Sequence, residues 1–192
     1  MPTLRSAVLI VALANLSYFF VEFTVALNIK AVSLFADSAD FLEDASVNLL
    51  IFTALAWSTT SRSRMGKVMA LILLAPAFAF ISSAWQKINL PLPPAPLPLS
   101  LTGLGALAVN LSCALLLSAY RDHRGSLTKA AFLSARNDAI ANLAIIAAGL
   151  VTGYLWNSVW PDLVVGGAIG IMNIDAAKKV WSAADGEMRE AP

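Results

Sequence analysis

The sequence predicts an all-α integral membrane bundle of six transmembrane helices, with the N- and C-termini on the cytoplasmic side. Three observations predict it: an apolar composition, six apolar windows of membrane-spanning length, and a one-sided distribution of Lys and Arg. Of the 192 residues, 58% are hydrophobic and only 13% are charged, and the mean hydropathy is +0.73. A soluble domain of this size needs more charge, because most of its exterior must be wetted.

Each of the six windows is long enough to cross a membrane as a helix, since about 20 apolar residues span a hydrocarbon layer about 30 Å thick. The windows cover residues 6–28, 33–57, 67–86, 99–120, 128–154 and 160–182. The first is too long for the apolar core of a signal peptide, and no small-residue cleavage site follows it. We therefore expect it to remain as the first helix.

The segments between the windows carry polar or turn-forming residues. They are Asn28–Lys30, Ser58–Ser63, Leu90–Ser100, Arg121–Gly125 and Asn157–Asp162. The third segment contains five prolines. Because proline fixes φ and removes a backbone donor, we expect an extended connection there rather than a helix. The sequence thus predicts a six-helix transmembrane domain over 1–182 and a short cytoplasmic tail over 183–192.

The basic residues set the orientation, because loops on the cytoplasmic side of a membrane are enriched in Lys and Arg. If the N-terminus is cytoplasmic, ten of these residues lie inside and only Lys30 and Lys87 lie outside. The ten are Arg5, Arg62, Arg64, Lys67, Arg121, Arg124, Lys129, Lys178, Lys179 and Arg189. The five tryptophans fall near predicted helix ends, as in an interfacial aromatic belt. Both signals favour six crossings with both termini inside.

The second window carries acids that an apolar helix should not contain. Asp37, Asp40, Glu43 and Asp44 fall within an arc of roughly 120° at a helical period. Each costs about 2.5–3.5 kcal/mol on insertion scales when ionised at the bilayer centre. We therefore expect this acidic face to meet a partner helix, a cavity or an ion.

The fifth window supplies a matching polar face, because Ser134, Asp138 and Asn142 follow an i, i+4, i+8 spacing. At about 1.5 Å per residue, Asp40 and Asp44 lie about 12–18 Å from the outer end of their helix. Asp138 lies about 15 Å from the inner end of its own helix. Both sets reach the middle of the bilayer, which predicts a shared cation site.

The candidate metal ligands divide into two groups. Asp40, Asp44 and Asp138 are the principal candidates, and Ser134, Asn142 and Asp37 are weaker ones. The alternative is that the acids are protonated, or pair with each other and with Asn or Ser, and so hold helices together. Asp37, nearest the outer interface, fits that structural role best. Glu22 in the first window is expected at the outer interface rather than beside an ion pathway.

The chain resembles the transmembrane domain of the cation diffusion facilitator (cation efflux) family. The resemblance covers the six helices and the run Ser33-Leu-Phe-Ala-Asp37-Ser-Ala-Asp40-x-x-x-Asp44. In that family, pairs of His or Asp four positions apart on two helices form a tetrahedral divalent-metal site. The resemblance implies that Asp40 and Asp44 are one pair and that Asp138 is the second member of the other. Asn142 matches a polar position common in the family.

Three features depart from the family pattern. Ser134 stands where the family usually has His or Asp, the accessory histidines between the second and third helices are missing, and no C-terminal cytoplasmic domain follows Trp181. The sequence is identified as a divergent member of this family that lacks the C-terminal domain. A homodimer is implied by the resemblance alone.

We expect the protein to be a divalent cation transporter that exports the cation in exchange for protons. It should be a multi-pass protein of the cell membrane, and the bacterial inner membrane is the expected one. An all-oxygen ligand set favours Mn²⁺, Mg²⁺ or Fe²⁺, whereas the family implies Zn²⁺, Co²⁺ or Cd²⁺, so the ion stays open. No permanently bound cofactor is expected. The net charge of +1 does not produce the strong positive potential that would attract nucleic acid. The chain has a single cysteine, Cys113, which excludes a disulfide within the chain.

Two other functions compete with transport. Two aspartates on facing helices could share a proton in an intramembrane aspartyl hydrolase, but the Tyr-Asp and Gly-x-Gly-Asp sequences of such enzymes are absent, so we expect no enzymatic activity. A non-transporting membrane subunit or sensor, whose acidic face binds a partner helix, is the stronger rival. Binding of divalent ions would distinguish transport from this alternative.

Overall fold

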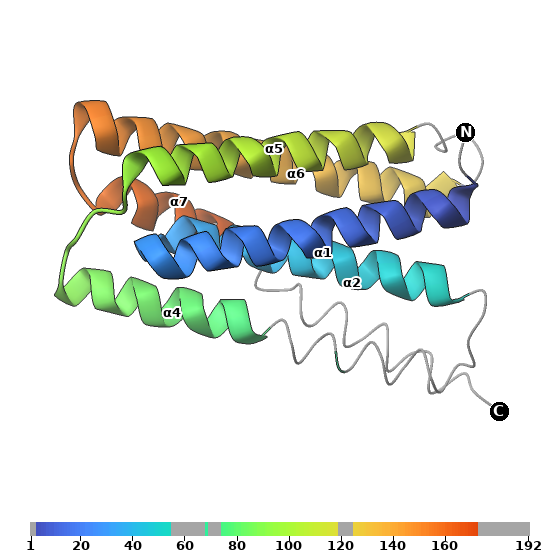
Figure 1. The fold of residues 1–192 in the computed structure, drawn as a ribbon, viewed down its shortest axis with the longest axis horizontal. Coiled ribbons are helices and arrows are strands. Elements are labelled where there is room, and N and C mark those ends of the chain that lie inside the picture. The colour runs from blue at the N-terminus through green and yellow to red at the C-terminus, as the bar shows by residue number, and fades with distance from the viewer. Residues whose placement is uncertain (1–2, 55–67, 69–73, 119–124, 173–192) are drawn as a thin grey trace.

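A computed structural model of the chain describes residues 3–54, 74–118 and 125–172, together with Val68. Within these ranges the regular structure is helical. The elements are α1 (Leu4–Ile29), α2 (Val32–Ala54), α4 (Leu74–Asn89), α5 (Pro96–Ser118), α6 (Gly125–Leu150), the π-helical turn η1 (Val151–Leu155) that continues α6, and α7 (Trp160–Met172). The helices lie side by side as one elongated bundle (Figure 1).

The described helices follow the six predicted windows, which confirms the all-α prediction. Three of them are long and apolar enough to cross a membrane, namely Arg5–Ile29, Pro96–Ser118 and Asn137–Leu155, and the shorter Trp160–Met172 is also apolar. The chain is a multi-pass membrane protein. The predicted loop at Ser58–Ser63 and the tail over 183–192 lie outside the described residues.

The proline-rich segment is shorter than predicted, because α5 already begins at Pro96. The first amides of a helix have no acceptor within that helix, so Pro96 and Pro98 lose no hydrogen bond in the first turn. The amide of Leu99 donates to the carbonyl of Ala95 at 3.2 Å. The expectation of a non-helical Leu90–Ser100 is therefore wrong for its second half.

A tight reversal joins α1 to α2. Lys30 ends α1 in the left-handed region, with φ 54° and ψ 40°, and the amide of Ala31 donates to the carbonyl of Ala26 at 3.2 Å. Because only two residues separate the helices, α1 and α2 run antiparallel and pack along their length. Residues at the end of α1 thus face residues at the start of α2.

Helix α2 occupies the centre of the bundle. It contacts α1, α4, α6 and α7, and residues 31–38 are all buried. Gly166 of α7 permits one of these contacts, since a Cβ there would lie 2.8 Å from the amide nitrogen of Ser33. This helix carries the acidic run, so its central position places those acids inside the protein.

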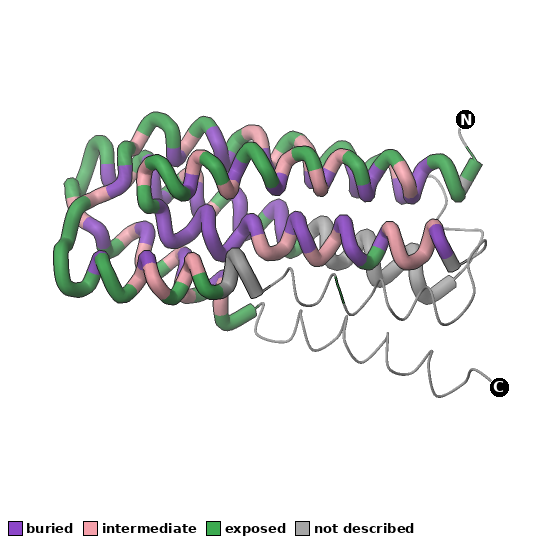
Figure 2. Tube along the Cα trace, turned by 60° about the horizontal axis from the view of Figure 1, so that its bottom comes forward, coloured by how far each residue is buried: buried purple, intermediate pink, exposed green. Residues whose placement is uncertain are grey.

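Polar and apolar side chains are distributed as expected for a protein in lipid. Buried residues gather where helices face each other, and exposed residues line the outer sides (Figure 2). Large apolar side chains are exposed on those outer sides, among them Phe20, Phe78, Leu115 and Ile171. Asn15, Glu22, Asp37, Asn142 and Asp162 are instead completely buried. Polar groups in membrane helices face the bundle interior, because unsatisfied polar groups in hydrocarbon are costly.

Candidate metal centre

The acids of α2 point into the bundle to different extents. Asp37 is fully buried, whereas Asp40, Glu43 and Asp44 are half-buried. On α6, Asp138 is 9% exposed, while its neighbour Asn137 faces outward. Helices α2 and α6 are in contact, and Asp37 and Asn142 meet across this contact.

Asp138 is close enough to three acids of α2 to interact with them electrostatically. Asp44 has the largest effect on it, followed by Asp37 and then Glu43. The Oδ2 atom of Asp138 is buried and has no hydrogen-bond donor. An acceptor without a donor in such a position is costly unless a proton or a cation compensates it. Among the described side chains, however, no group of three or more His, Cys, Asp and Glu residues has the arrangement of a metal site.

Two of the weaker candidates bind each other directly. Nδ2 of Asn142 on α6 donates to Oδ2 of Asp37 on α2 at 2.7 Å. Nδ2 of Asn110 on α5 donates in turn to Oδ1 of Asn142 at 3.1 Å. Both asparagines are buried, so this chain of amides links three helices and orients Asp37. The side chain of Ser134 lies outside the described part of α6.

The side chain of Glu22 is 0% exposed, inside the bundle, whereas the sequence predicts it at the outer interface. Its carboxyl group interacts with that of Asp37 across the α1–α2 contact. The helical spacing of Asn15 and Glu22, two turns apart on one face of the first window, was the available signal.

Asp162 is a further buried acid that the sequence did not single out. Its carboxylate accepts hydrogen bonds from the amides of Val32 and Ser33, at 2.8 and 3.0 Å, at the start of α2. Nζ of Lys87 on α4 lies 2.8 Å from Oδ2 of Asp162. This cluster is structural in character, because every contact satisfies a helix end or a charge.

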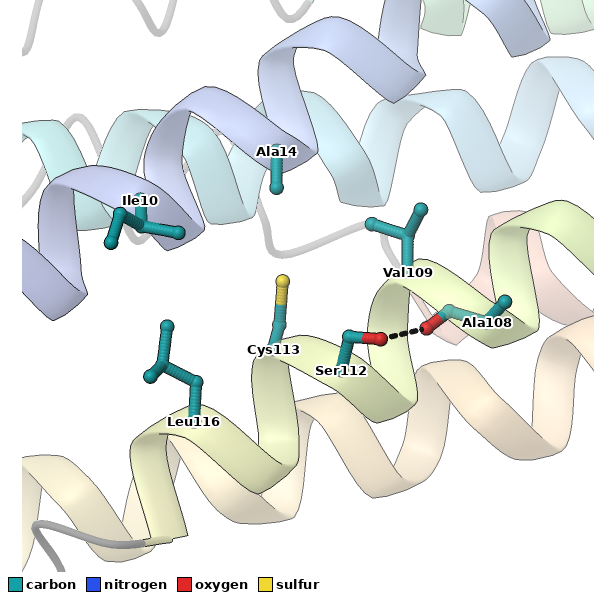
Figure 3. A pocket seen from close by; sticks show the side chains of 7 residues that line it. All are labelled: Ile10, Ala14, Ala108, Val109, Ser112, Cys113 and Leu116. Carbon is teal, nitrogen blue, oxygen red and sulfur yellow. Dashed lines mark hydrogen bonds between the residues drawn. The ribbon is translucent and has the colours of Figure 1, made fainter. Parts of the chain in front are cut away.

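Cys113 lies in an apolar pocket between α1 and α5 (Figure 3). The pocket has a volume of about 280 Å³ and is lined by Ile10, Ala14, Ala108, Val109, Ser112, Cys113 and Leu116. The hydroxyl of Ser112 donates to the carbonyl of Ala108 at 2.7 Å, so it is satisfied within its own helix. The lining offers no carboxylate or imidazole to a cation.

The family comparison covers nearly the whole chain. The family model of the cation efflux transmembrane domain matches residues 8–182. A search of curated proteins returns no match. The matched range includes every acid described above.

Proposed function

The chain belongs to the cation efflux family, and we propose that it exports a divalent metal cation from the cytoplasm in exchange for protons. The observation that carries the proposal is Asp138, a buried acid of α6 whose Oδ2 atom has no hydrogen-bond donor. Ionisable groups inside a membrane bundle are rare and typically mark ion pathways.

The proposed ligands are Asp40, Asp44 and Asp138. Asp40 and Asp44 are one helical turn apart and share a face of α2. Ser134 is one turn before Asp138 on α6, and its hydroxyl would be a weak fourth ligand. Asp37 is already held by Asn142 at 2.7 Å, which supports a separate role for these two side chains.

Competition for the carboxylates supplies the coupling. A carboxylate must be ionised to bind a metal, so a proton and a cation exclude each other at the same site. When such a site is exposed alternately to the two sides of a membrane, one cation leaves as protons enter. Lowering the pH on the cation-loading side should therefore reduce uptake.

The ligand chemistry and the family point to different ions. Carboxylate and hydroxyl oxygens favour Mn²⁺, Mg²⁺ or Fe²⁺, while the family resemblance favours Zn²⁺, Co²⁺ or Cd²⁺. The proposal places the protein in a cell membrane with both termini in the cytoplasm, and as a homodimer. Uptake measured with each ion in turn would identify the cargo.

The test uses the purified protein in sealed liposomes that contain a metal-sensitive dye. With an outward proton gradient, wild-type protein should accumulate at least one of the six ions. Asp40→Asn and Asp138→Asn should abolish uptake and keep the elution profile of the folded protein. Asn137→Ala is the matched control, because Asn137 is adjacent to Asp138 but faces outward.

Two results would contradict the proposal. Uptake by Asp40→Asn and Asp138→Asn at the wild-type rate would remove the assigned ligands. Failure of wild-type protein to bind or move any of the ions would favour the rival role, in which the acidic face binds a partner helix.

A further inference from the structure

Glu22 and Asp37 form a second acidic pair, between α1 and α2. Both side chains are 0% exposed. Their carboxyl groups are close enough to interact with each other. An ionised carboxylate can only accept hydrogen bonds, so two carboxyl groups in contact need a proton or a cation between them.

The pair also presents oxygen atoms that no protein group satisfies. Both carboxyl oxygens of Glu22 and Oδ1 of Asp37 are buried without a donor. The remaining atom, Oδ2 of Asp37, accepts from Nδ2 of Asn142 at 2.7 Å. The hydroxyl of Tyr18, one turn before Glu22, is not available either, since it donates to the carbonyl of Thr102 at 2.6 Å.

No cationic side chain that the structure describes lies beside Glu22 and Asp37. Lys87 pairs with Asp162 at 2.8 Å, and Arg5 stacks over the ring of Phe52 at 4.7 Å from its centroid. Lys30 is exposed at the end of α1. None of these three supplies the charge that Glu22 and Asp37 require.

We propose that Glu22 and Asp37 bind a second divalent cation, next to the one assigned to Asp40, Asp44 and Asp138. This inference rests on the proposed function. One divalent ion neutralises two carboxylates, and a set of oxygen ligands suits a hard cation. The amide of Asn142 holds one oxygen of Asp37 and leaves the other to face Glu22.

The position of the pair gives the second ion a place on the transport route. Asp37 precedes Asp40 by three residues, or about 4.5 Å along the axis of α2, on the side of the α1–α2 turn. Asp40 acts electrostatically on Glu22, and Asp37 on Asp138. Glu22 and Asp37 would therefore be the next carboxylates for a cation that leaves Asp40, Asp44 and Asp138 toward the α1–α2 turn.

Calorimetric titration of the purified protein in detergent with Mn²⁺, and separately with Zn²⁺, tests the inference. Wild-type protein should bind about two ions per chain, and Glu22→Gln, which keeps the shape but removes the charge, about one. Asp37→Asn should have the same effect. Asn137→Ala should retain both ions, and thermal unfolding should show that each variant is folded. Glu22→Asp, which keeps the charge, should restore part of the second binding event if Glu22→Gln does not fold.

The same titration separates the two proposals. If Asp40→Asn loses transport while Glu22→Gln binds as many ions as wild type, the second site is refuted and the transporter stands. If Glu22→Gln changes only the number of protons exchanged, measured in buffers of different ionisation enthalpy, the pair carries a proton and the second site is again refuted. If wild-type protein binds neither Mn²⁺ nor Zn²⁺, the titration is repeated with Mg²⁺, Fe²⁺, Co²⁺ and Cd²⁺, and the proposed function itself fails if none of the six binds.

Discussion

Nζ of Lys87 lies 2.8 Å from Oδ2 of Asp162, and the two side chains are 3% and 0% exposed. The same carboxylate accepts from the amides of Val32 and Ser33, and from the hydroxyl of Ser33 at 2.6 Å. Asp162 of α7 therefore caps the N-terminus of α2, and it also pairs with Lys87, the single basic residue in the last turn of α4. The helix that carries the proposed cation ligands is anchored at this point.

Replacing Lys87 by Met should destabilise the protein by about 3–5 kcal/mol, because it leaves the charge of Asp162 buried without its partner. Chemical or thermal unfolding in detergent measures the effect. The double variant Lys87→Met/Asp162→Asn should recover part of the loss, since no unpaired charge remains. Lys30→Met is the control, because Lys30 is exposed and its loss should change little. Equal stability of Lys87→Met and wild type would contradict the role of the ion pair.

Gly166→Ala should weaken the contact between α7 and α2. A Cβ at this position would lie 2.8 Å from the amide nitrogen of Ser33 and from the carbonyl carbon of Val32. These backbone atoms of α2 cannot move aside as easily as a side chain can. Overpacking of this kind lowers the free energy of unfolding by about 1–3 kcal/mol. Gly167→Ala is the matched control one residue away, where a Cβ meets nothing within 4 Å. We expect a lower melting temperature for the first variant only; equal melting temperatures would show that α7 can shift.

Asn142→Ala should cost stability and disturb Asp37. It removes the donor to Oδ2 of Asp37 and the acceptor of Asn110, and each unsatisfied buried group costs about 1–3 kcal/mol. Asn110→Ala removes only the outer link of this chain and should cost less. Unfolding measurements on both variants test the ranking. The reverse order would mean that Asn110, rather than Asn142, holds the polar chain together.

Both termini should lie in the cytoplasm. The basic residues of the short loops divide ten to two under this orientation, and cytoplasmic loops attract Lys and Arg. Green fluorescent protein fused to either terminus of the whole chain should fluoresce in cells, since it folds poorly after export. Alkaline phosphatase fused to the same ends should be inactive. Fluorescence at one end only would indicate an odd number of crossings.

The helical windows were predictable from sequence because crossing a bilayer imposes a local requirement on every segment. Each helix satisfies its own backbone hydrogen bonds, so length and hydropathy are enough to locate it. The start of α5 was placed too late, since proline was treated as a helix breaker at positions where it is harmless. The inward orientation of Asp138 and Asn142 also followed from their i, i+4 spacing on one face.

The sequence by itself determined the class of protein, the helical segments, the family and the acids that lie within the predicted spans. The tertiary structure decided which groups meet: Glu22 with Asp37, Asn142 with Asp37, and Lys87 with Asp162. The physical reason is that the energy of a buried polar group depends on the group across the helix contact. Periodicity gives the face on which a residue lies and not its partner, which can be more than a hundred positions away, as Ser33 is from Asp162.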